Sequence, residues 1–296
     1  MNYNKIIFGT LILFVLILIT ACSNDEKKSE KESSVKSVRT TDTDTDTEKG
    51  KLLRKGEELM IYTNSKMPEH VGNKLACTSC HAQGGNGNAL SLEGVSKKYP
   101  QYRDREGRDV SLKERINGCF ARSMNGKPIK ENSEEMKAMV AYLDFISEDI
   151  KKSEAPEIEQ AKNIPEPNVD KGKEAFDRNN CLSCHGNGSS SAPFTGPSLW
   201  GPDSFNTGAG MSRFSKMYDF IYHNMPFGEE GTLSKQEASD ITAYILMQDR
   251  PGFVNKSKEK FYPKGGEPDD KISEKEREQI LNHDYDWQEL EEVSSK

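Results

Sequence analysis

The stretch Cys77-Thr78-Ser79-Cys80-His81 decides the fold, because the chain repeats its pattern as Cys181-Leu182-Ser183-Cys184-His185. Before each copy stands a short segment, Lys55–Met60 or Lys171–Phe176, with a glycine and a large apolar residue four positions apart. That spacing puts both residues on one face of a helix. The chain therefore holds two copies of one plan, in which a helix leads into a CxxCH motif.

Each copy also ends in a segment with the apolar spacing of a helix. These residues run from Met136 to Ile146 in the first copy and from Ala238 to Ile245 in the second, where Ser234 and Glu237 have capping-box spacing. The pattern predicts an all-α protein with two tandem domains, residues 52–150 and 169–250. A polar, proline-containing linker, residues 151–168, joins them. The first copy carries extra residues, Tyr62–Lys74, before its motif.

The CxxCH motif indicates a haem site. Its two thiols can form thioethers with the vinyl groups of a haem while the adjacent histidine binds the iron. A zinc site would need closed sets of four ligands, and a thioredoxin-like dithiol would need a βαβ pattern, which the sequence lacks. We therefore expect two tandem cytochrome c-like domains, each with one covalently bound haem c. The attaching and ligating residues are Cys77, Cys80, His81, Cys181, Cys184 and His185.

Each iron then needs a sixth ligand. In the second domain Met225 lies 40 residues after His185, where small c-type cytochromes place an axial methionine. The alternatives are Met211, Met217 and His223, which we interpret as packing or surface residues.

In the first domain the corresponding position, 38 residues after His81, is occupied by Cys119. Met124 is the alternative ligand, and a buried structural thiol is the alternative role for Cys119. Arg115 and Arg122 flank Cys119, and neighbouring cations favour a thiolate over a thiol. A thiolate ligand lowers the reduction potential of a haem and a methionine raises it. We therefore expect a low-potential first haem and a higher-potential second haem.

A cluster of arginines surrounds this cysteine in the sequence. Five of the chain's eleven arginines fall between positions 103 and 122, although the net charge is −7. Arginine is preferred where oxyanions are held by paired hydrogen bonds, and Ser123 adds a hydroxyl donor. A solvated charged face is the alternative, but the pattern favours a local oxyanion site. The acidic balance of the whole chain argues against nucleic acid as a partner.

The N-terminus indicates export. Lys5 precedes a short apolar run, and Ile19-Thr20-Ala21-Cys22 is similar to a bacterial lipoprotein cleavage box, so residues 1–21 are predicted to be a signal peptide and Cys22 a lipidation site. An uncleaved anchor helix is the alternative. Residues 22–51 are predicted to be a disordered tether, because they are almost wholly polar and charged. We expect an extracytoplasmic protein, anchored by lipid to the outer face of the cytoplasmic membrane or lying in the periplasm.

The segment from Arg115 to Gly126, together with both CxxCH motifs, resembles the dihaem c-type thiosulfate dehydrogenases, also called tetrathionate synthases. Trp200-Gly201-Pro202 and Asn224-Met225-Pro226 extend this resemblance, which covers about residues 50 to 265. It implies oxidation of two thiosulfate ions to tetrathionate, with electrons passed through the haems to an external acceptor such as another cytochrome c or a terminal oxidase. Some members carry an exchangeable lysine beside the second methionine; here Asn224 implies plain His/Met ligation.

The resemblance also implies roles for residues around the first haem. Cys119 would be both iron ligand and catalytic thiol, Arg105 and Arg115 would hold substrate, and Ser123 and Gln83 would line the site. The reverse reaction, tetrathionate reduction, would use the same residues. The competing interpretations are a dihaem electron carrier without catalysis, which would need neither Cys119 nor the arginines, and a sulfur carrier with a persulfide on Cys119. The polar tail, residues 251–296, is predicted to contain a short helix around Ile280 that docks on a domain.

Overall fold

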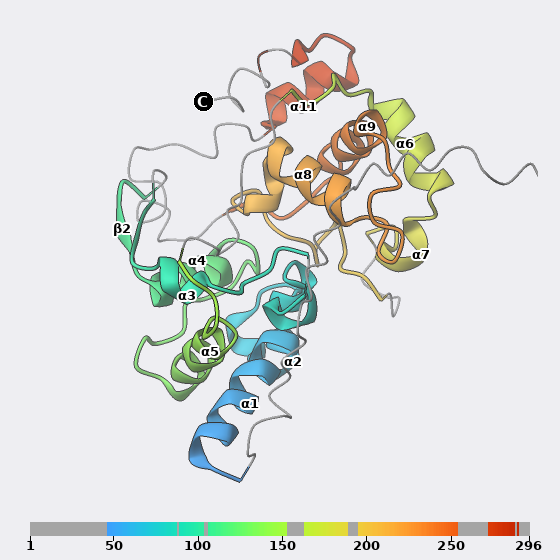
Figure 1. Ribbon diagram of the computed structural model, residues 1–296. Helices are drawn as coiled ribbons and strands as arrows, with labels where there is room; N and C mark the ends of the chain where they lie inside the picture. The colour runs from blue at the N-terminus through green and yellow to red at the C-terminus, as the bar shows by residue number, and fades with distance from the viewer. Residues whose placement is uncertain are drawn as a thin grey trace, which may run out of the picture. The chain divides into compact units, whose positions relative to one another are not determined.

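The computed structural model describes residues 46–87, 89–103, 106–152, 163–188, 195–253, 272–287 and 289 (Figure 1). The predicted leader, Cys22, most of the tether and Arg105 lie outside these residues. Within the described part of the chain, no helix combines the length and apolar content needed to cross a membrane.

The first domain contains helices and one short hairpin. Its elements are α1 (Glu48–Ile61), α2 (Thr63–Lys66), η2 (Pro68–His70), η3 (Cys77–Ser79), η4 (Ala82–Gly85), α3 (Val95–Lys98), β1 (Gln101–Arg103), β2 (Arg108–Val110), α4 (Leu112–Ala121) and α5 (Glu134–Phe145). The helix predicted after Glu134 is α5, so the apolar spacing there is confirmed.

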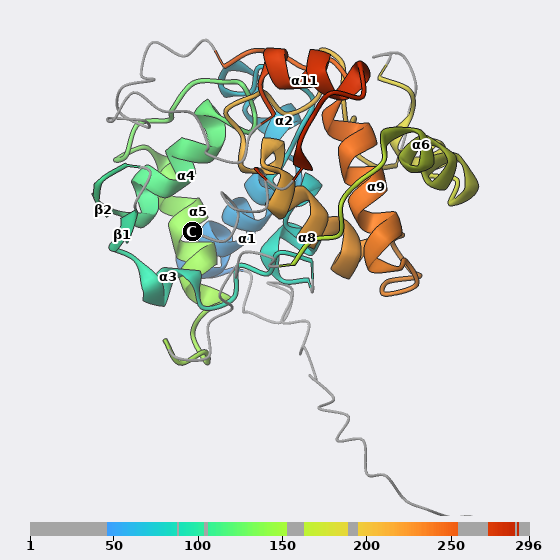
Figure 2. The same cartoon turned by 90° about the horizontal axis from the view of Figure 1, so that it is seen from above.

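Helices α1 and α5 form the frame of the first domain and lie side by side in both views (Figures 1 and 2). Leu53 and Met60 of α1 and Met139 of α5 are almost completely buried, and Met60 and Met139 belong to the same hydrophobic core. Gly56 permits the close approach, because a Cβ there would collide with the Ala138 carbonyl. This explains the glycine of the predicted first helix.

The first helix begins earlier than the sequence indicates. Thr47 accepts a hydrogen bond from the backbone N–H of Gly50, and Glu48 stands in the first turn near the positive end of the helix dipole. The predicted tether therefore ends too late at residue 51. Its last residues are polar, but the Thr47 cap starts the helix where apolar content alone gives no signal.

The second domain repeats this frame. Its elements are α6 (Val169–Arg178), α7 (Leu182–His185), η5 (Gly210–Ser212), α8 (Phe214–Asn224) and α9 (Lys235–Leu246). Gly172 of α6 meets the backbone of Asp240 in α9, as Gly56 meets that of Ala138. The predicted capping box of Ser234 and Glu237 is present at the start of α9. Two helix-rich domains of one plan confirm the predicted fold.

A hairpin that the sequence analysis missed lies between α3 and α4. Strands β1 and β2 pair antiparallel, with Gln101 opposite Val110 and Arg103 opposite Arg108. Each strand has only three residues, and Val110 is the one buried apolar side chain among them, so no alternation of polar and apolar residues marks them. The domain is thus not purely helical, and the hairpin carries two of the predicted arginines.

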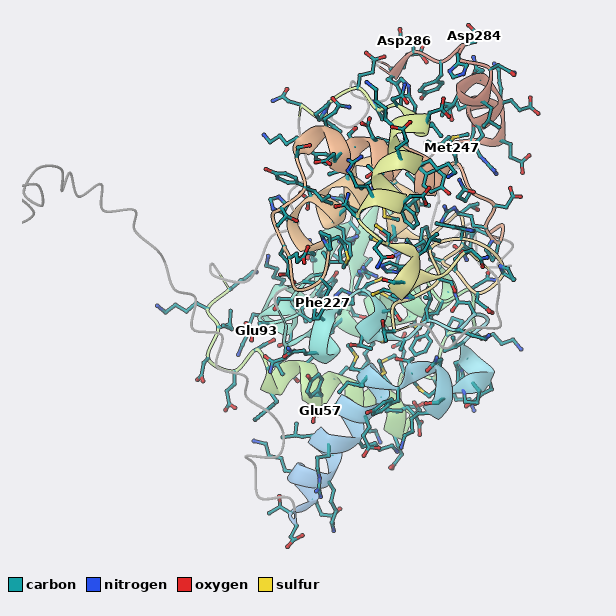
Figure 3. All side chains as sticks on the ribbon, turned by 90° about the vertical axis from the view of Figure 1, so that its right-hand side faces the viewer. Glu57, Glu93, Phe227, Met247, Asp284 and Asp286 are labelled. Carbon is teal, nitrogen blue, oxygen red and sulfur yellow. The ribbon has the colours of Figure 1, made fainter. Side chains whose placement is uncertain are left out.

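The C-terminal segment contains α11 (Glu274–Leu281), where the tail was predicted to form a short helix. Ile280 is buried, and the Arg277 guanidinium donates to the Met247 carbonyl just after α9. Trp287 packs against Phe214 of α8, with ring centroids 5.7 Å apart. The segment therefore docks on the second domain, while Asp284 and Asp286 remain at its surface (Figure 3).

Candidate active site

The histidines of the two CxxCH motifs are held in the same way. In the first domain, His81 Nδ1 lies 2.7 Å from the Leu90 carbonyl oxygen; in the second, His185 Nδ1 lies 2.8 Å from the Pro197 carbonyl oxygen. A carbonyl at this distance accepts a hydrogen bond from Nδ1–H, which fixes the tautomer and leaves Nε2 as the metal-binding nitrogen. Both histidines are thus prepared as axial ligands.

The residues around the first motif fit a covalently attached haem. None of the five cysteines among the described residues is in a disulfide. Burial raises the pKa of both Cys77 and Cys80 to about 12, so these thiols stay neutral. Burial also lowers the pKa of His81 to about 4, which keeps its imidazole in the neutral form that binds iron. The buried environment of these residues therefore fits a haem, with the two cysteines as attachment points and His81 as an iron ligand.

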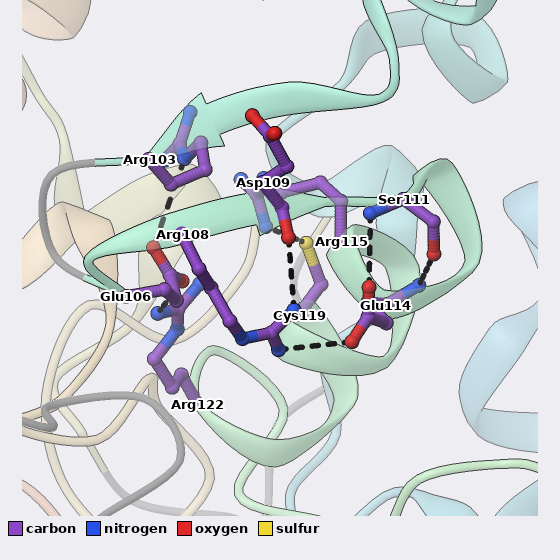
Figure 4. A network of polar contacts seen from close by, with 9 residues as sticks. All are labelled: Arg103, Glu106, Arg108, Asp109, Ser111, Glu114, Arg115, Cys119 and Arg122. Atoms are coloured by element: carbon purple, nitrogen blue, oxygen red, sulfur yellow. Dashed lines mark hydrogen bonds and ion pairs between the residues drawn. The ribbon is translucent and has the colours of Figure 1, made fainter.

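Helix α4 presents the residue pair at the centre of the predicted site. Ser111 and Glu114 form a capping box that fixes where α4 begins. Arg115 and Cys119 therefore stand one turn apart on the same face. Arg115 Nη1 donates a hydrogen bond to Cys119 Sγ over 2.8 Å (Figure 4). The charge of Cys119 is the main cause that raises the pKa of Arg115, so the guanidinium stays charged beside the sulfur.

Cys119 lies close to the first CxxCH motif. Its charge is among the causes that raise the pKa of Cys77 and of Cys80, and the charge of Arg115 contributes to lowering that of His81. The sulfur is therefore within electrostatic range of the two cysteines of the motif, and the guanidinium within electrostatic range of its histidine. Met124, the alternative ligand, is 3% exposed and belongs to the hydrophobic core.

Two carboxylates contact three arginines of the predicted cluster: Glu114 faces Arg108, and Glu106 faces Arg122 and, over 3.9 Å, Arg103 (Figure 4). Arg108 contacts Glu114 over 2.9 Å, and this hydrogen bond is the main cause that lowers the pKa of Glu114 to about 2. Arg122, predicted to lie beside Cys119, contacts Glu106 over 3.1 Å, and both side chains are 5% exposed. Arg115 is thus the arginine that contacts the cysteine among the described residues. Arg105 lies outside them.

Two further predicted site residues occupy loops. Ser123 follows α4 and is half-buried, and its carbonyl accepts a hydrogen bond from Asn73. Gln83 lies in η4 directly after the first motif, is exposed and has a left-handed backbone conformation with φ of 52°. The structure brings Ser123 to the end of the helix that carries Cys119. The roles of both side chains toward substrate stay predictions.

In the second domain, Met225 caps the C-terminal end of α8 and packs half-buried against the core. The alternative ligands have other surroundings: Met217 is 2% exposed within the core, and the exposed His223 lies 3.5 Å from an Asp219 oxygen. Phe227, two residues beyond Met225, is 79% exposed and stands at the surface (Figure 3). Ligation by Met225 stays a prediction.

Sequence analysis missed two residues of the network. Glu114 stands three residues after Ser111, so the capping-box spacing could have identified its place at the start of α4. Glu106 had no such signal, because its partner Arg122 comes from α4's C-terminal end and meets it only through the hairpin. The burial of the Glu106 carboxylate could therefore be recognised only in the folded structure.

The two domains match family models that agree with this geometry. Residues 66–151 match the SoxA/TsdA cytochrome c domain, and residues 169–249 match cytochrome c. The chain is therefore a dihaem cytochrome of the c type and carries two covalently bound haems, as the two CxxCH motifs predicted.

Relatives define the family more narrowly. The chain is 40% identical over 240 residues to the thiosulfate dehydrogenase of Psychrobacter arcticus, covering 77% of this chain and 72% of the relative. It is 36% identical to the thiosulfate dehydrogenase of Allochromatium vinosum, covering 69% of this chain and 80% of the relative. The chain belongs to the thiosulfate dehydrogenase family.

A solved structure shows the same likeness. The thiosulfate dehydrogenase TsdBA from Marichromatium purpuratum, in its as-isolated form, superimposes with a TM-score of 0.64 and 29% identity. The match covers 69% of this chain and 47% of that one, so this chain spans about half the length of the solved protein.

Proposed function

We propose that the protein oxidises two thiosulfate ions to tetrathionate, with Cys119 as the reactive sulfur, and that the same site can reduce tetrathionate. The observation that carries this proposal is the 2.8 Å contact between Arg115 Nη1 and Cys119 Sγ, within electrostatic range of the first CxxCH motif. An electron carrier needs neither a reactive sulfur nor a cation against it. The relatives named above are enzymes, which favours catalysis over simple electron transfer.

The reaction can be written in two balanced steps at Cys119. First, the Cys119 thiolate bonds to the outer sulfur of one thiosulfate, which gives a Cys–S–S–SO₃⁻ adduct and releases two electrons. A second thiosulfate then attacks the sulfur that came from the first, the bond to Cys119 breaks, and tetrathionate leaves with the thiolate restored. No proton is gained or lost in either step. The two haems supply one-electron acceptors for the two electrons.

The chain's own residues hold the charges that this chemistry brings together. A thiolate and two dianions repel one another, and the Arg115 guanidinium beside Cys119 offsets part of that repulsion. Arg105 and the Ser123 hydroxyl complete our proposed set of substrate contacts, and Gln83 lines the approach. Positioning and charge neutralisation are the main tasks, because the sulfur chemistry itself needs no acid or base.

The two domains are proposed to divide the work through their sixth ligands. His81 and Cys119 would hold the first iron, and His185 and Met225 the second. Since a thiolate lowers a haem potential and a methionine raises it, these ligands would favour movement of electrons from the first domain toward the second and then to an external acceptor. Another cytochrome c or a terminal oxidase would suit that acceptor.

The cytochrome c domains indicate a place outside the cytoplasm. We propose in addition that Cys22 carries lipid and that the polar tether holds the domains away from the membrane. Labelling with a radioactive fatty acid tests this anchor: wild-type protein should be labelled and Cys22→Ala should not. Equal labelling of both would contradict it.

Replacement of Cys119 by glycine tests the proposed catalysis. Both haems should stay attached, because their thioether cysteines are untouched, and a pyridine haemochrome assay measures this. Turnover of thiosulfate with ferricyanide as acceptor should be abolished. Full turnover by this variant would rule the proposed mechanism out.

A further inference from the structure

The contacts of the insert Tyr62–Lys74, the extra residues of the first copy, indicate what this segment does. In the second domain α6 ends at Arg178 and the haem motif follows directly at Cys181. In the first domain α1 ends at Ile61, and the chain passes through α2 and η2 before it reaches Cys77. A simple haem-binding domain therefore does not need this segment, and its contacts show what it adds.

The end of the insert lies along the loop that follows Cys119. Gly72 donates its backbone N–H to the Met124 carbonyl over 2.9 Å, and Lys127 donates to the His70 carbonyl over 3.1 Å. The His70 ring also donates from Nδ1 to the Lys127 carbonyl over 3.0 Å. A Cβ on Gly72 would collide with the Asn125 backbone, so the two segments approach as closely as backbones can.

Asn73 makes the most connections in this segment. Its side-chain Nδ2 donates to the Ser123 carbonyl over 3.0 Å and to the Ser204 carbonyl over 2.9 Å. Its Oδ1 accepts from the backbone N–H of Leu75 over 3.1 Å. One amide thereby uses both of its N–H donors and its acceptor. It joins the loop after Cys119, the segment that leads into Cys77, and the second domain.

A second contact lies beside the first. Asn206 Nδ2 donates to Asn125 Oδ1 over 3.0 Å, and Asn206 has no exposed surface. Ser204, which receives the Asn73 hydrogen bond, is equally buried. The Ser123–Asn125 turn is therefore held from the insert on one side and from the 204–206 loop of the second domain on the other.

We propose that Asn73 is a positioning residue for the sulfur chemistry: it holds the Ser123 turn, the first haem-attachment segment and the second domain in one register. This proposal rests on the proposed function for its kinetic effects, though not for its structural ones. A displacement of about 1 Å at a reacting group can lower the rate by a large factor. Hydrogen bonds that fix the Ser123 turn therefore matter for the rate. Asn73 acts through the backbone of Ser123 and needs no contact with substrate.

The substitution Asn73→Asp tests the proposal with little change of shape. The retained oxygen still accepts from Leu75, while the other oxygen now faces the two carbonyls that the amide bonded. Loss of both hydrogen bonds should lower kcat with thiosulfate about tenfold. The matched control is Asn64→Asp, which removes one hydrogen bond from the same insert, Asn64 Nδ2 to the Lys74 carbonyl at 2.7 Å, without touching the Ser123 turn. The control should keep the wild-type kcat.

Two readouts without turnover separate positioning from general loosening. In Asn73→Asp, hydrogen exchange should accelerate at the amides of Gly72 and Lys127, and the low-temperature spin-resonance signal of the first haem should broaden. Neither should change in Asn64→Asp. Asn206→Asp provides a second variant: it removes the hydrogen bond from Asn206 to Asn125 and should accelerate exchange in the 123–127 segment even if Asn73→Asp folds poorly.

These measurements give two results that would overturn the proposal and one that separates it from the proposed function. Wild-type exchange and an unchanged first-haem signal in Asn73→Asp would overturn the proposal, as would equal effects of Asn73→Asp and Asn64→Asp. If the wild-type protein fails to turn over thiosulfate while the exchange and spin-resonance effects are present, the proposed function fails and the positioning role stands.

Discussion

The two domains share one frame and differ in what surrounds the iron site. In each, a glycine lets the first helix meet the last, and a backbone carbonyl orients the histidine of the CxxCH motif. The first domain adds an insert, a hairpin and a network of arginines and carboxylates around Cys119. In the second domain aromatic side chains pack together instead, and the ring centroids of Phe176 and Trp200 lie 5.5 Å apart. Both copies of the shared frame carry a CxxCH motif, and we propose that the added parts of the first domain serve the chemistry at Cys119.

Replacement of the proposed sixth ligand of the first haem should have the largest effect on the difference between the two domains. Cys119→Met gives the first domain the ligand type that we propose for the second. Thiosulfate turnover should fall at least about 1,000-fold, because the reactive thiolate is gone. The first haem's reduction potential should rise, and spectroelectrochemical titration measures it. A variant that keeps wild-type turnover would show that Cys119 has no part in the chemistry.

The next largest effect should come from removal of the Arg115 guanidinium, which contacts the Cys119 sulfur. Arg115→Leu should lower kcat/KM for thiosulfate about 100-fold, since the charge that faces both thiolate and substrate is lost. Arg108→Leu is the matched control on the hairpin: its guanidinium pairs with Glu114 over 2.9 Å, whereas that of Arg115 contacts Cys119, so a much smaller kinetic loss is expected. Equal losses would mean that the whole cluster attracts substrate and that Arg115 has no special role.

The buried pair of Glu106 and Arg122 should matter for stability. Glu106→Gln removes the carboxylate charge that faces the Arg122 guanidinium over 3.1 Å, where both side chains are 5% exposed, and should lower the free energy of unfolding of the first domain by about 2 kcal/mol. Hydrogen exchange at the amides of α4 measures this loss.

The second domain offers the control for this prediction. Arg178 and Glu237 form a pair whose side chains are 58% and 33% exposed, and Arg178→Met should cost less than about 1 kcal/mol. A cost as large as that of Glu106→Gln would contradict the distinction between a buried and an exposed pair.

The smallest effect concerns pH. The hydrogen bond from Arg108, followed by that from the Ser111 N–H, lowers the pKa of Glu114 from 4.5 to about 2. A carboxyl whose pKa falls on folding adds stability that is fully present above its unfolded pKa and is lost as pH falls through its folded pKa. Exchange at the start of α4 should therefore accelerate as pH is lowered from about 4.5 to about 2, beyond the intrinsic change of exchange rate with pH. In Glu114→Gln this extra acceleration should be absent.

The frame could be read from the sequence because its signals are local. The CxxCH spacing, the glycine before each motif and the apolar period of α5 and α9 each lie within one helix or turn. The same holds for Arg115 and Cys119, whose four-residue spacing on α4 became a hydrogen bond.

The remaining features depend on contacts between distant segments. Arg122 pairs with Glu106, which lies 16 positions earlier in the chain and is brought to it by the hairpin. Asn73 likewise meets Ser123 and Ser204, which lie 50 and 131 positions further along the chain. No local pattern marks such partners, so the structure was needed to find them.

We propose that the Cys119 sulfur both binds the first iron and is the reactive group. A low-temperature electron spin-resonance spectrum of the oxidised protein, with and without the Cys119→Gly substitution, tests it most directly. We expect a histidine/thiolate low-spin signal in the wild type that disappears in the variant, beside a histidine/methionine signal that is the same in both. A wild-type spectrum without a thiolate-ligated haem, or one unchanged by the substitution, would contradict it.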